Sequence, residues 1–112
     1  MKKIEAIIRP GKLEDIKEAL NKYNVNGLTI SQVMGCGLQK GRKEYFRGTE
    51  VTMNLLPKIK VEAVVRNDQL EEVINIISKE AKTGEVGDGK IFIYDIEDSI
   101  RIRTGERGNS AI

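Results

Sequence analysis

Hydrophobic positions in the first third of the chain follow two different periods. Residues 3–9 alternate between apolar and polar side chains, with Ile4, Ala6 and Ile8 on one face, which predicts a half-buried strand. Apolar residues then recur at helical spacing from Leu13 to Tyr23. Residues 28–34 have β-branched character and predict a second strand running toward Gly35.

The same order returns in the second half of the chain. Residues 59–65 alternate strictly and predict a third strand, beginning after Pro57. An apolar stripe from Leu70 to Ala81 predicts a second helix, which the glycines at 84, 87 and 89 end. Residues 90–96 predict a fourth strand, residues 99–103 a short extended piece, and residues 104–112 an irregular tail.

This order predicts one α+β domain, residues 1–112, with a ferredoxin-like βαββαβ sandwich. Both helices would cover one face of an antiparallel sheet. The other face would carry a mixture of charged and apolar residues that we expect to be buried against another subunit: Lys3, Glu5, Ile7, Glu62, Val64, Phe92 and Tyr94. The long, charged connection between strands two and three, residues 37–58, is unusual in so small a domain and indicates a functional segment.

Composition narrows the function classes. The 112 residues carry a net charge of +2, which is too small for a general nucleic-acid-binding field. The chain has no histidine and one cysteine, so an internal disulfide is excluded and a zinc site is disfavoured. No apolar run is long enough to span a bilayer, and the N-terminus lacks the pattern of a signal peptide. We therefore expect a cytoplasmic protein.

A glycine-rich stretch, Thr83 to Lys90, is the first candidate anion site. Gly87 and Gly89 would let backbone N–H groups turn toward an anion, and Lys90 would add a positive charge. It is not a Walker A loop, because no Ser or Thr follows the lysine and a strand follows instead of a helix. An ordinary helix-to-strand turn with a solvated lysine remains an open alternative on spacing alone.

Two further stretches could lie close to a ligand. Arg101 and Arg103 would leave the same side of an extended chain, an arrangement suited to a polyphosphate or, alternatively, to a charged edge that discourages strand pairing. Gly35 and Gly37 would allow a ligand near a strand end, with Cys36 between them expected as a small buried hydrophobe. None of these three stretches contains an acid–base pair together with a nucleophile. The sequence therefore favours anion binding over catalysis, and we expect that the protein is not an enzyme.

Four segments together carry a resemblance to a known family: MKKIEAII, QKGRKEYFRGTE, TGEVGDGKIFIYDI and IRIRTGE. The third and fourth are the most specific. On these segments the chain resembles, over its full length, the PII nitrogen-regulatory signal-transduction proteins of the GlnB/GlnK type. The resemblance implies a non-enzymatic regulator of nitrogen metabolism that forms a compact homotrimer.

The resemblance also implies ligands and the residues that hold them. ATP and ADP would compete for clefts between subunits, and 2-oxoglutarate would bind beside Mg-ATP. Lys58 would pair with a 2-oxoglutarate carboxylate, and Gln39 would contact both the ketoacid and Mg. The matching nucleotide positions are Thr29, Gly35, Gly37, Glu62, Val64, Gly87, Asp88, Gly89, Lys90, Arg101 and Arg103, of which both arginines would come from the adjacent subunit; those for 2-oxoglutarate are Gln39, Gly41, Lys58 and Gly87.

Residues 37–58 resemble the protruding T-loop of the family, which docks onto target proteins. The implied targets include an ammonium transporter, glutamine synthetase and other nitrogen-assimilation enzymes or regulators, so membrane contact would be indirect, and no nucleic acid is implied. The implied docking residues are Arg42, Tyr45, Phe46, Arg47, Gly48, Thr49 and Val51. The target itself, and any modification of Thr49 or Tyr45, stay open.

This chain departs from the family pattern at two positions. Val51 stands where many members have a tyrosine that is uridylylated, and valine has no hydroxyl to modify. Leu38 stands where many members have an arginine that reaches the phosphates, which leaves the balance of ATP and ADP affinity, and any residual ATPase activity, open.

Two other protein classes share the predicted element order. An RRM-like RNA binder would need Phe92 and Tyr94 on an open sheet face for base stacking. An acylphosphatase-like enzyme could use Arg9 beside the Pro10-Gly11 turn, but no phosphate-cradling loop follows that turn.

Overall fold

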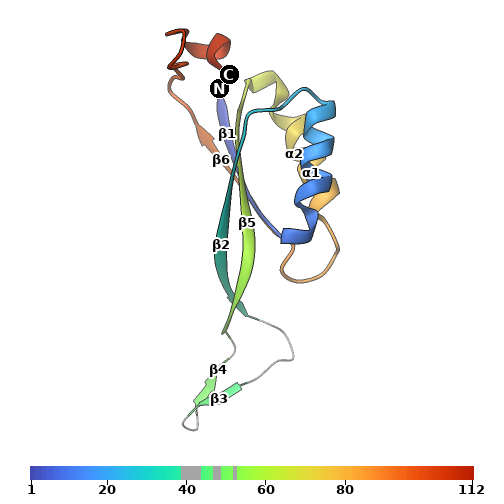
Figure 1. The fold of residues 1–112 in the computed structure, drawn as a ribbon. Coiled ribbons are helices and arrows are strands. Elements are labelled where there is room, and N and C mark those ends of the chain that lie inside the picture. Colours follow the sequence, from blue (N-terminus) through green and yellow to red (C-terminus); the bar gives the residue numbers. More distant parts are fainter. Residues whose placement is uncertain (39–43, 47–48, 52) are drawn as a thin grey trace.

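A computed structural model describes residues 1–38, 44–46, 49–51 and 53–112. Both halves of the chain have the predicted strand–helix–strand order (Figure 1). The main elements are β1 (Lys2–Ile8), α1 (Leu13–Lys22), β2 (Leu28–Leu38), β5 (Met53–Val65), α2 (Leu70–Ala81) and β6 (Gly89–Asp95). The minor elements are the 3-10 helices η1 (Pro10–Lys12), η2 (Asn67–Gln69) and η3 (Gly108–Ala111), and the paired strands β3 (Glu44–Phe46) and β4 (Thr49–Val51).

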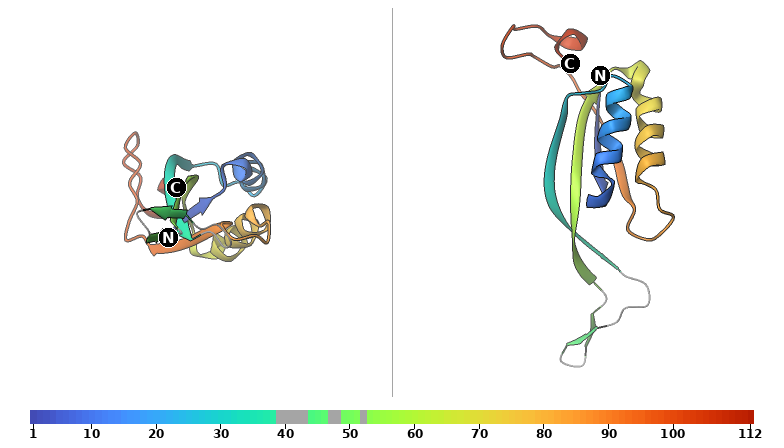
Figure 2. Two further views of the ribbon diagram at one scale, coloured as in Figure 1. Left: turned by 90° about the horizontal axis from the view of Figure 1, so that it is seen from below. Right: turned by 45° about the vertical axis from the view of Figure 1, so that its right-hand side comes forward.

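The main sheet has four strands in the order β2-β5-β1-β6, and neighbouring strands are antiparallel. Both α-helices cover the same face of this sheet (Figure 2). This is the ferredoxin-like arrangement that the sequence predicts. Within the part of the chain that the structure describes, no helix is long and apolar enough to cross a membrane.

The hydrophobic core lies between the sheet and the helices. The alternating residues of β1 and β5 supply one side of it, and Ile16, Leu20, Val73 and Ile77 of the helices supply the other. Ile16, Leu20 and Val73 are fully buried. Burying a side chain of this size contributes about 1.5–3 kcal/mol, so the period-2 and helical stripes in the sequence are what bring the two layers together.

Strands β2 and β5 are longer than the sequence predicts. They remain paired from Leu28 opposite Ala63 to Leu38 opposite Met53, so residues 37–38 and 53–58 belong to strands. The predicted start of the third strand after Pro57 is therefore wrong. β1 ends where Ile8 pairs with Ile59, so Pro57 lies beyond it and has β2 as its sole partner strand among the described residues. A residue without an N–H is tolerated where one side of a strand is open.

The paired strands β2 and β5 run past the end of the helix layer (Figure 1). Met34 and Leu55 are 57% and 63% exposed, and Cys36 is exposed as well. The expectation that Cys36 is buried is wrong, because no helix covers that part of the ribbon.

The chain after β6 also differs from its prediction. Ile100 bridges Arg107, residues 102–104 turn, and η3 follows, so the extended piece ends early and the tail is not irregular. Gly105, at φ +73°, donates its N–H to the carbonyl of Arg101 at 2.7 Å and closes the turn. Arg107 and the amide N–H of Gly108 both bind the carboxylate of Asp98, which holds the base of this segment.

Candidate functional site

The loop between α2 and β6 folds around its own carboxylate. Asp88 accepts hydrogen bonds from the amide N–H groups of Thr83 and Gly84, at 2.8 and 2.9 Å, and from the Thr83 hydroxyl. The Thr83 hydroxyl first, then the two amides and the Arg9 guanidinium, hold the pKa of Asp88 well below its ordinary range. The Asp88 side chain is thus used within the loop, although the family pattern places this residue among the nucleotide-binding positions.

Two cationic side chains, from Arg9 directly after β1 and Lys58 in β5, bind carbonyl groups of this loop. Arg9 donates from Nε to Asp88 at 3.2 Å and from Nη2 to the carbonyl of Val86 at 2.9 Å. Lys58 donates from Nζ to the carbonyl of Gly87 at 2.6 Å. No hydrogen bond among the described residues uses the amide N–H of Val86 or Gly87. The loop therefore leaves two N–H groups available to an anion, beside two positive charges.

The sequence names Arg9 only in the acylphosphatase-like alternative and not among the nucleotide-binding residues, because its place beside the loop follows from the strand pairing. β1 pairs with β6 through Ile8 and Gly89, and with β5 through Ile8 and Ile59. One step further along both registers sets Arg9 opposite Asp88 and Lys58. The register of these strand pairs, which the structure provides, therefore identifies Arg9 as a residue of this site.

Glycines at this end of the molecule lie close to neighbouring groups, and at Gly89 the contact excludes any side chain. Gly89 has φ +109°, and a Cβ there would lie 1.7 Å from the carbonyl oxygen of Ile7. A Cβ on Gly35 would lie 3.1 Å from Cγ of Lys58. Gly87, at φ +102°, adopts a backbone conformation that side chains disfavour. Lys90 is exposed at the start of β6, opposite Ile7, so the predicted residues Gly35, Lys58, Gly87, Asp88, Gly89 and Lys90 gather here.

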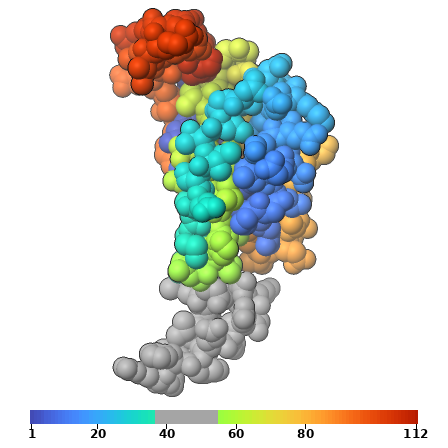
Figure 3. All heavy atoms as spheres, viewed as in Figure 1, coloured from blue at the N-terminus to red at the C-terminus, as the bar shows by residue number. Residues whose placement is uncertain are grey.

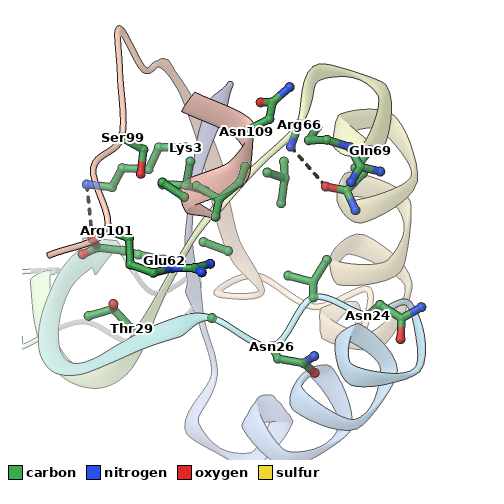
Figure 4. A pocket seen from close by; sticks show the side chains of 17 residues that line it. Lys3, Asn24, Asn26, Thr29, Glu62, Arg66, Gln69, Ser99, Arg101 and Asn109 are labelled. Atoms are coloured by element: carbon green, nitrogen blue, oxygen red, sulfur yellow. Dashed lines mark hydrogen bonds and ion pairs between the residues drawn. The ribbon is translucent and has the colours of Figure 1, made fainter. Parts of the chain in front are cut away.

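A second group of predicted residues lines a cavity of about 680 Å³ near the other end of the sheet. Thr29, Glu62, Val64 and Arg101 belong to its wall. Thr29, Glu62, Ser99 and Arg101 gather on one side of the cavity, and Asn24, Asn26, Arg66 and Gln69 on the other (Figure 4).

Arg101 and Arg103 do not form the predicted pair of parallel forks. Residues 102–104 turn, so the prediction that both guanidinium groups leave one side of an extended chain is wrong. Arg101 lines the cavity and pairs with Glu106 at 3.2 Å, whereas Arg103 is exposed in the turn.

The two groups lie at different ends of the body. In the space-filling view, the C-terminal residues in red cap one end, and the orange residues that follow α2 lie toward the other (Figure 3). Along β5, Lys58 and Glu62 are four residues apart, which corresponds to about 13 Å of extended chain. No residue from 83 to 90 lines the Arg101 cavity. Within one chain the two groups form separate surfaces.

Comparison with known proteins decides the family. A model of the family described as nitrogen regulatory protein P-II matches residues 1–106. The chain is 52% identical to a nitrogen regulatory protein P-II of Rhodospirillum rubrum and 50% identical to nitrogen regulatory protein GlnK of Escherichia coli K12, with all of each chain covered. The chain belongs to the nitrogen regulatory protein P-II family.

Membership of the P-II family confirms the resemblance found in the sequence and makes the chain a regulator of nitrogen metabolism. These relatives are named as regulatory proteins, in agreement with the expectation that the chain is not an enzyme. The RNA-binding and acylphosphatase-like alternatives are set aside on the same ground.

The outer sheet face of this P-II protein has the predicted composition. The register aligns Lys3 with Val64 and Tyr94, and Glu5 with Glu62 and Phe92. Lys3 pairs with Glu62 at 3.1 Å, and the Tyr94 hydroxyl donates to Glu5 at 3.0 Å. Phe92 and Tyr94 are 45% and 47% exposed, and the strand register places both rings beside these charged side chains. Burial of this face against another P-II subunit stays a prediction.

Several implied site residues fall in the part of the chain that is not described. Gln39, Gly41, Arg42, Arg47 and Gly48 lie outside the described residues. Gly37, Leu38, Tyr45, Phe46, Thr49 and Val51 belong to strands of which the backbone is described. The roles that the P-II resemblance implies for all of these residues stay predictions.

Proposed function

We propose that this P-II protein senses adenine nucleotides and 2-oxoglutarate and relays their levels to target proteins through residues 37–58. The observation that carries the proposal is the loop from Thr83 to Gly89. Its carbonyl groups at Val86 and Gly87 are bound by Arg9 and Lys58, and the N–H groups of the same two residues have no partner among the described residues. Such a loop suits the phosphates of ATP or ADP.

The Arg101 cavity supports a site shared between copies of the chain. Thr29, Glu62 and Val64 match positions that contact adenine and ribose in the family, and Arg101 matches a phosphate arginine. If the cavity of one chain faced the glycine loop of the next, the two halves would complete one nucleotide site. A closed ring of three such contacts is the homotrimer that the resemblance implies.

Magnesium would enter this site together with ATP. Among the described residues, no cluster of three His, Cys, Asp or Glu side chains could hold a metal ion alone. Oxygen ligands from the phosphates suit Mg²⁺, and Gln39, outside the described residues, would complete its surroundings. The metal would neutralise phosphate charge and so favour the approach of a dianionic ketoacid.

Lys58 links the two ligands to the long connection between β2 and β5. Its ammonium group binds the carbonyl of Gly87, and a 2-oxoglutarate carboxylate would offer it a charged acceptor instead. Lys58 is the last residue of the segment 37–58, and Gln39 is near its first residue. Binding of 2-oxoglutarate to both residues would therefore reorganise the base of that segment. Coupling between two sites is reciprocal and typically worth about 1–3 kcal/mol.

The targets that fit this proposal are an ammonium transporter, glutamine synthetase or other nitrogen-assimilation enzymes and regulators. Ligand binding would control the protein without uridylylation at position 51, where Val51 has no hydroxyl group. The protein would act in the cytoplasm and would reach a membrane only by binding a transporter. Pull-down with ADP, compared with Mg-ATP plus 2-oxoglutarate, should recover the target under one condition only. Equal recovery under both would contradict ligand control.

Calorimetry tests the sensing mechanism. We expect 2-oxoglutarate to bind at least tenfold more tightly with Mg-ATP present than without it, and Lys58→Ala to weaken the ketoacid far more than ATP. Arg103→Ala should weaken both nucleotides. Equal 2-oxoglutarate affinity with and without Mg-ATP would contradict the proposed coupling between the two ligands.

A further inference from the structure

Arg101 is held in place by Glu106 through both backbone and side chain. The Arg101 N–H donates to the carbonyl of Glu106 at 2.8 Å. Nη1 of the same arginine donates to Oε1 of Glu106 at 3.2 Å, and the Thr104 hydroxyl donates to that oxygen at 2.8 Å. Gly105 completes the turn by donating to the carbonyl of Arg101. One carboxylate oxygen thus fixes both the turn and the guanidinium group.

This contact leaves part of the guanidinium group available. Among the hydrogen bonds of the described residues, none uses Nε or Nη2 of Arg101. Those two nitrogens form an edge that suits bidentate recognition of a phosphate. Arg101 lines the cavity (Figure 4), and Glu106 is not among the residues that line it. Glu106 can therefore orient the arginine from outside the cavity, without contacting a ligand bound in it.

We propose that Glu106 is the positioning residue for Arg101 and raises the affinity of the nucleotide site by fixing the direction of its guanidinium group. The inference rests on the proposed function, since it assigns Arg101 to phosphate. An arginine side chain loses considerable rotamer entropy when it is immobilised. If Glu106 orients the side chain before the ligand arrives, less of that entropy is lost on binding.

A double-mutant cycle separates positioning from a general effect on the segment. ATP and ADP affinities are measured by calorimetry for the full-length wild-type protein, Glu106→Ala, Arg101→Ala and the double variant. Surface ion pairs contribute up to about 1 kcal/mol, so we expect Glu106→Ala to weaken both nucleotides about fivefold. In the Arg101→Ala background the same substitution should change affinity less than twofold, because its effect passes through Arg101.

Two further variants complete the test. Glu106→Gln keeps an oxygen acceptor and should stay within twofold of the wild type. Asp98→Ala removes the other carboxylate of the segment, which binds Arg107 and makes no bond to Arg101, and should also leave affinity within twofold. Circular dichroism melting confirms that each variant is folded.

Each other outcome overturns the inference. Unchanged or tighter binding by Glu106→Ala would mean that the carboxylate does not position Arg101, or competes with the phosphates for it. Equal effects of Glu106→Ala with and without Arg101, or equal losses in Asp98→Ala and Glu106→Ala, would indicate loosening of the segment. Absence of nucleotide binding by the wild-type protein would instead overturn the proposed function, and this inference with it.

Discussion

At the scale of single residues, Gly89 shows how a backbone contact restricts the sequence. Its positive φ and the 1.7 Å approach of Ile7 to a Cβ position exclude any side chain unless β1 and β6 separate. We predict that Gly89→Ala lowers the free energy of unfolding by at least about 2 kcal/mol, since a strained backbone alone costs about 1–3 kcal/mol. Gly11→Ala is the control, because a Cβ at Gly11 meets nothing within 4 Å. Urea denaturation of both variants measures the difference; equal stabilities would contradict this account.

Asp88 should make the stability of the protein depend on acid pH. Hydrogen bonds from Thr83, and the Arg9 guanidinium, lower the pKa of this carboxyl from its ordinary value of 3.8. A carboxyl whose pKa is lower in the folded state stabilises the fold above the unfolded-state pKa, and this contribution is lost as the pH falls. We predict that the stability difference between wild type and Asp88→Asn is constant above about pH 5 and shrinks below pH 4.

Thermal melts between pH 3 and 7 measure this dependence. Asp15→Asn is a suitable control, since no hydrogen bond among the described residues uses the Asp15 side chain. A wild-type advantage over Asp88→Asn that persists unchanged at pH 3 would show that the carboxylate charge contributes nothing.

At the scale of elements, the hydrophobic pattern predicts what is buried and fails where burial ends. One face of each predicted strand and helix packs in the core, so its apolar residues recur at the period of that element, as Ile4, Val61 and Val73 do. Cys36 of β2 is exposed and Leu55 of β5 is 63% exposed, so no alternation of buried and exposed positions marks these segments, and the sequence does not predict where β2 ends or where β5 begins. The turn after Arg101 depends on the distant bridge between Ile100 and Arg107, which no local pattern contains.

The same distinction predicts unequal effects of two leucine substitutions. Leu20 in α1 is fully buried in the core, whereas Leu55 in β5 is 63% exposed. Leu20→Ala should lower the free energy of unfolding by about 2–5 kcal/mol, because it removes buried atoms and leaves a cavity. Leu55→Ala should change it by less than about 0.5 kcal/mol. Denaturation at one fixed protein concentration compares them, and similar losses would mean that Leu55 is covered in solution.

At the scale of the whole molecule, the candidate site is divided between two ends of one chain. Lys58, Gly87 and Lys90 lie at one end, and Arg101 lines the cavity at the other. Motif matching could assign all of these residues to one function, but it could not reveal their separation, which follows from strand register and from the turn after β6. The separation gives the proposed oligomer a specific role, since neighbouring chains would have to contribute different halves of each site.

Mixed oligomers test this division directly. Lys90→Ala impairs the loop half, Arg101→Ala impairs the cavity half, and each variant alone should bind ATP weakly. In a randomly mixed trimer, about a quarter of the sites would combine an intact loop half with an intact cavity half from the next chain. Calorimetry of co-expressed variants should therefore recover that fraction at wild-type affinity. A mixture of Arg101→Ala and Arg103→Ala should recover none, because both residues belong to the segment after β6, which the resemblance assigns to the adjacent subunit. If the site lay within one chain, neither mixture would restore binding, because every chain would still carry a defect.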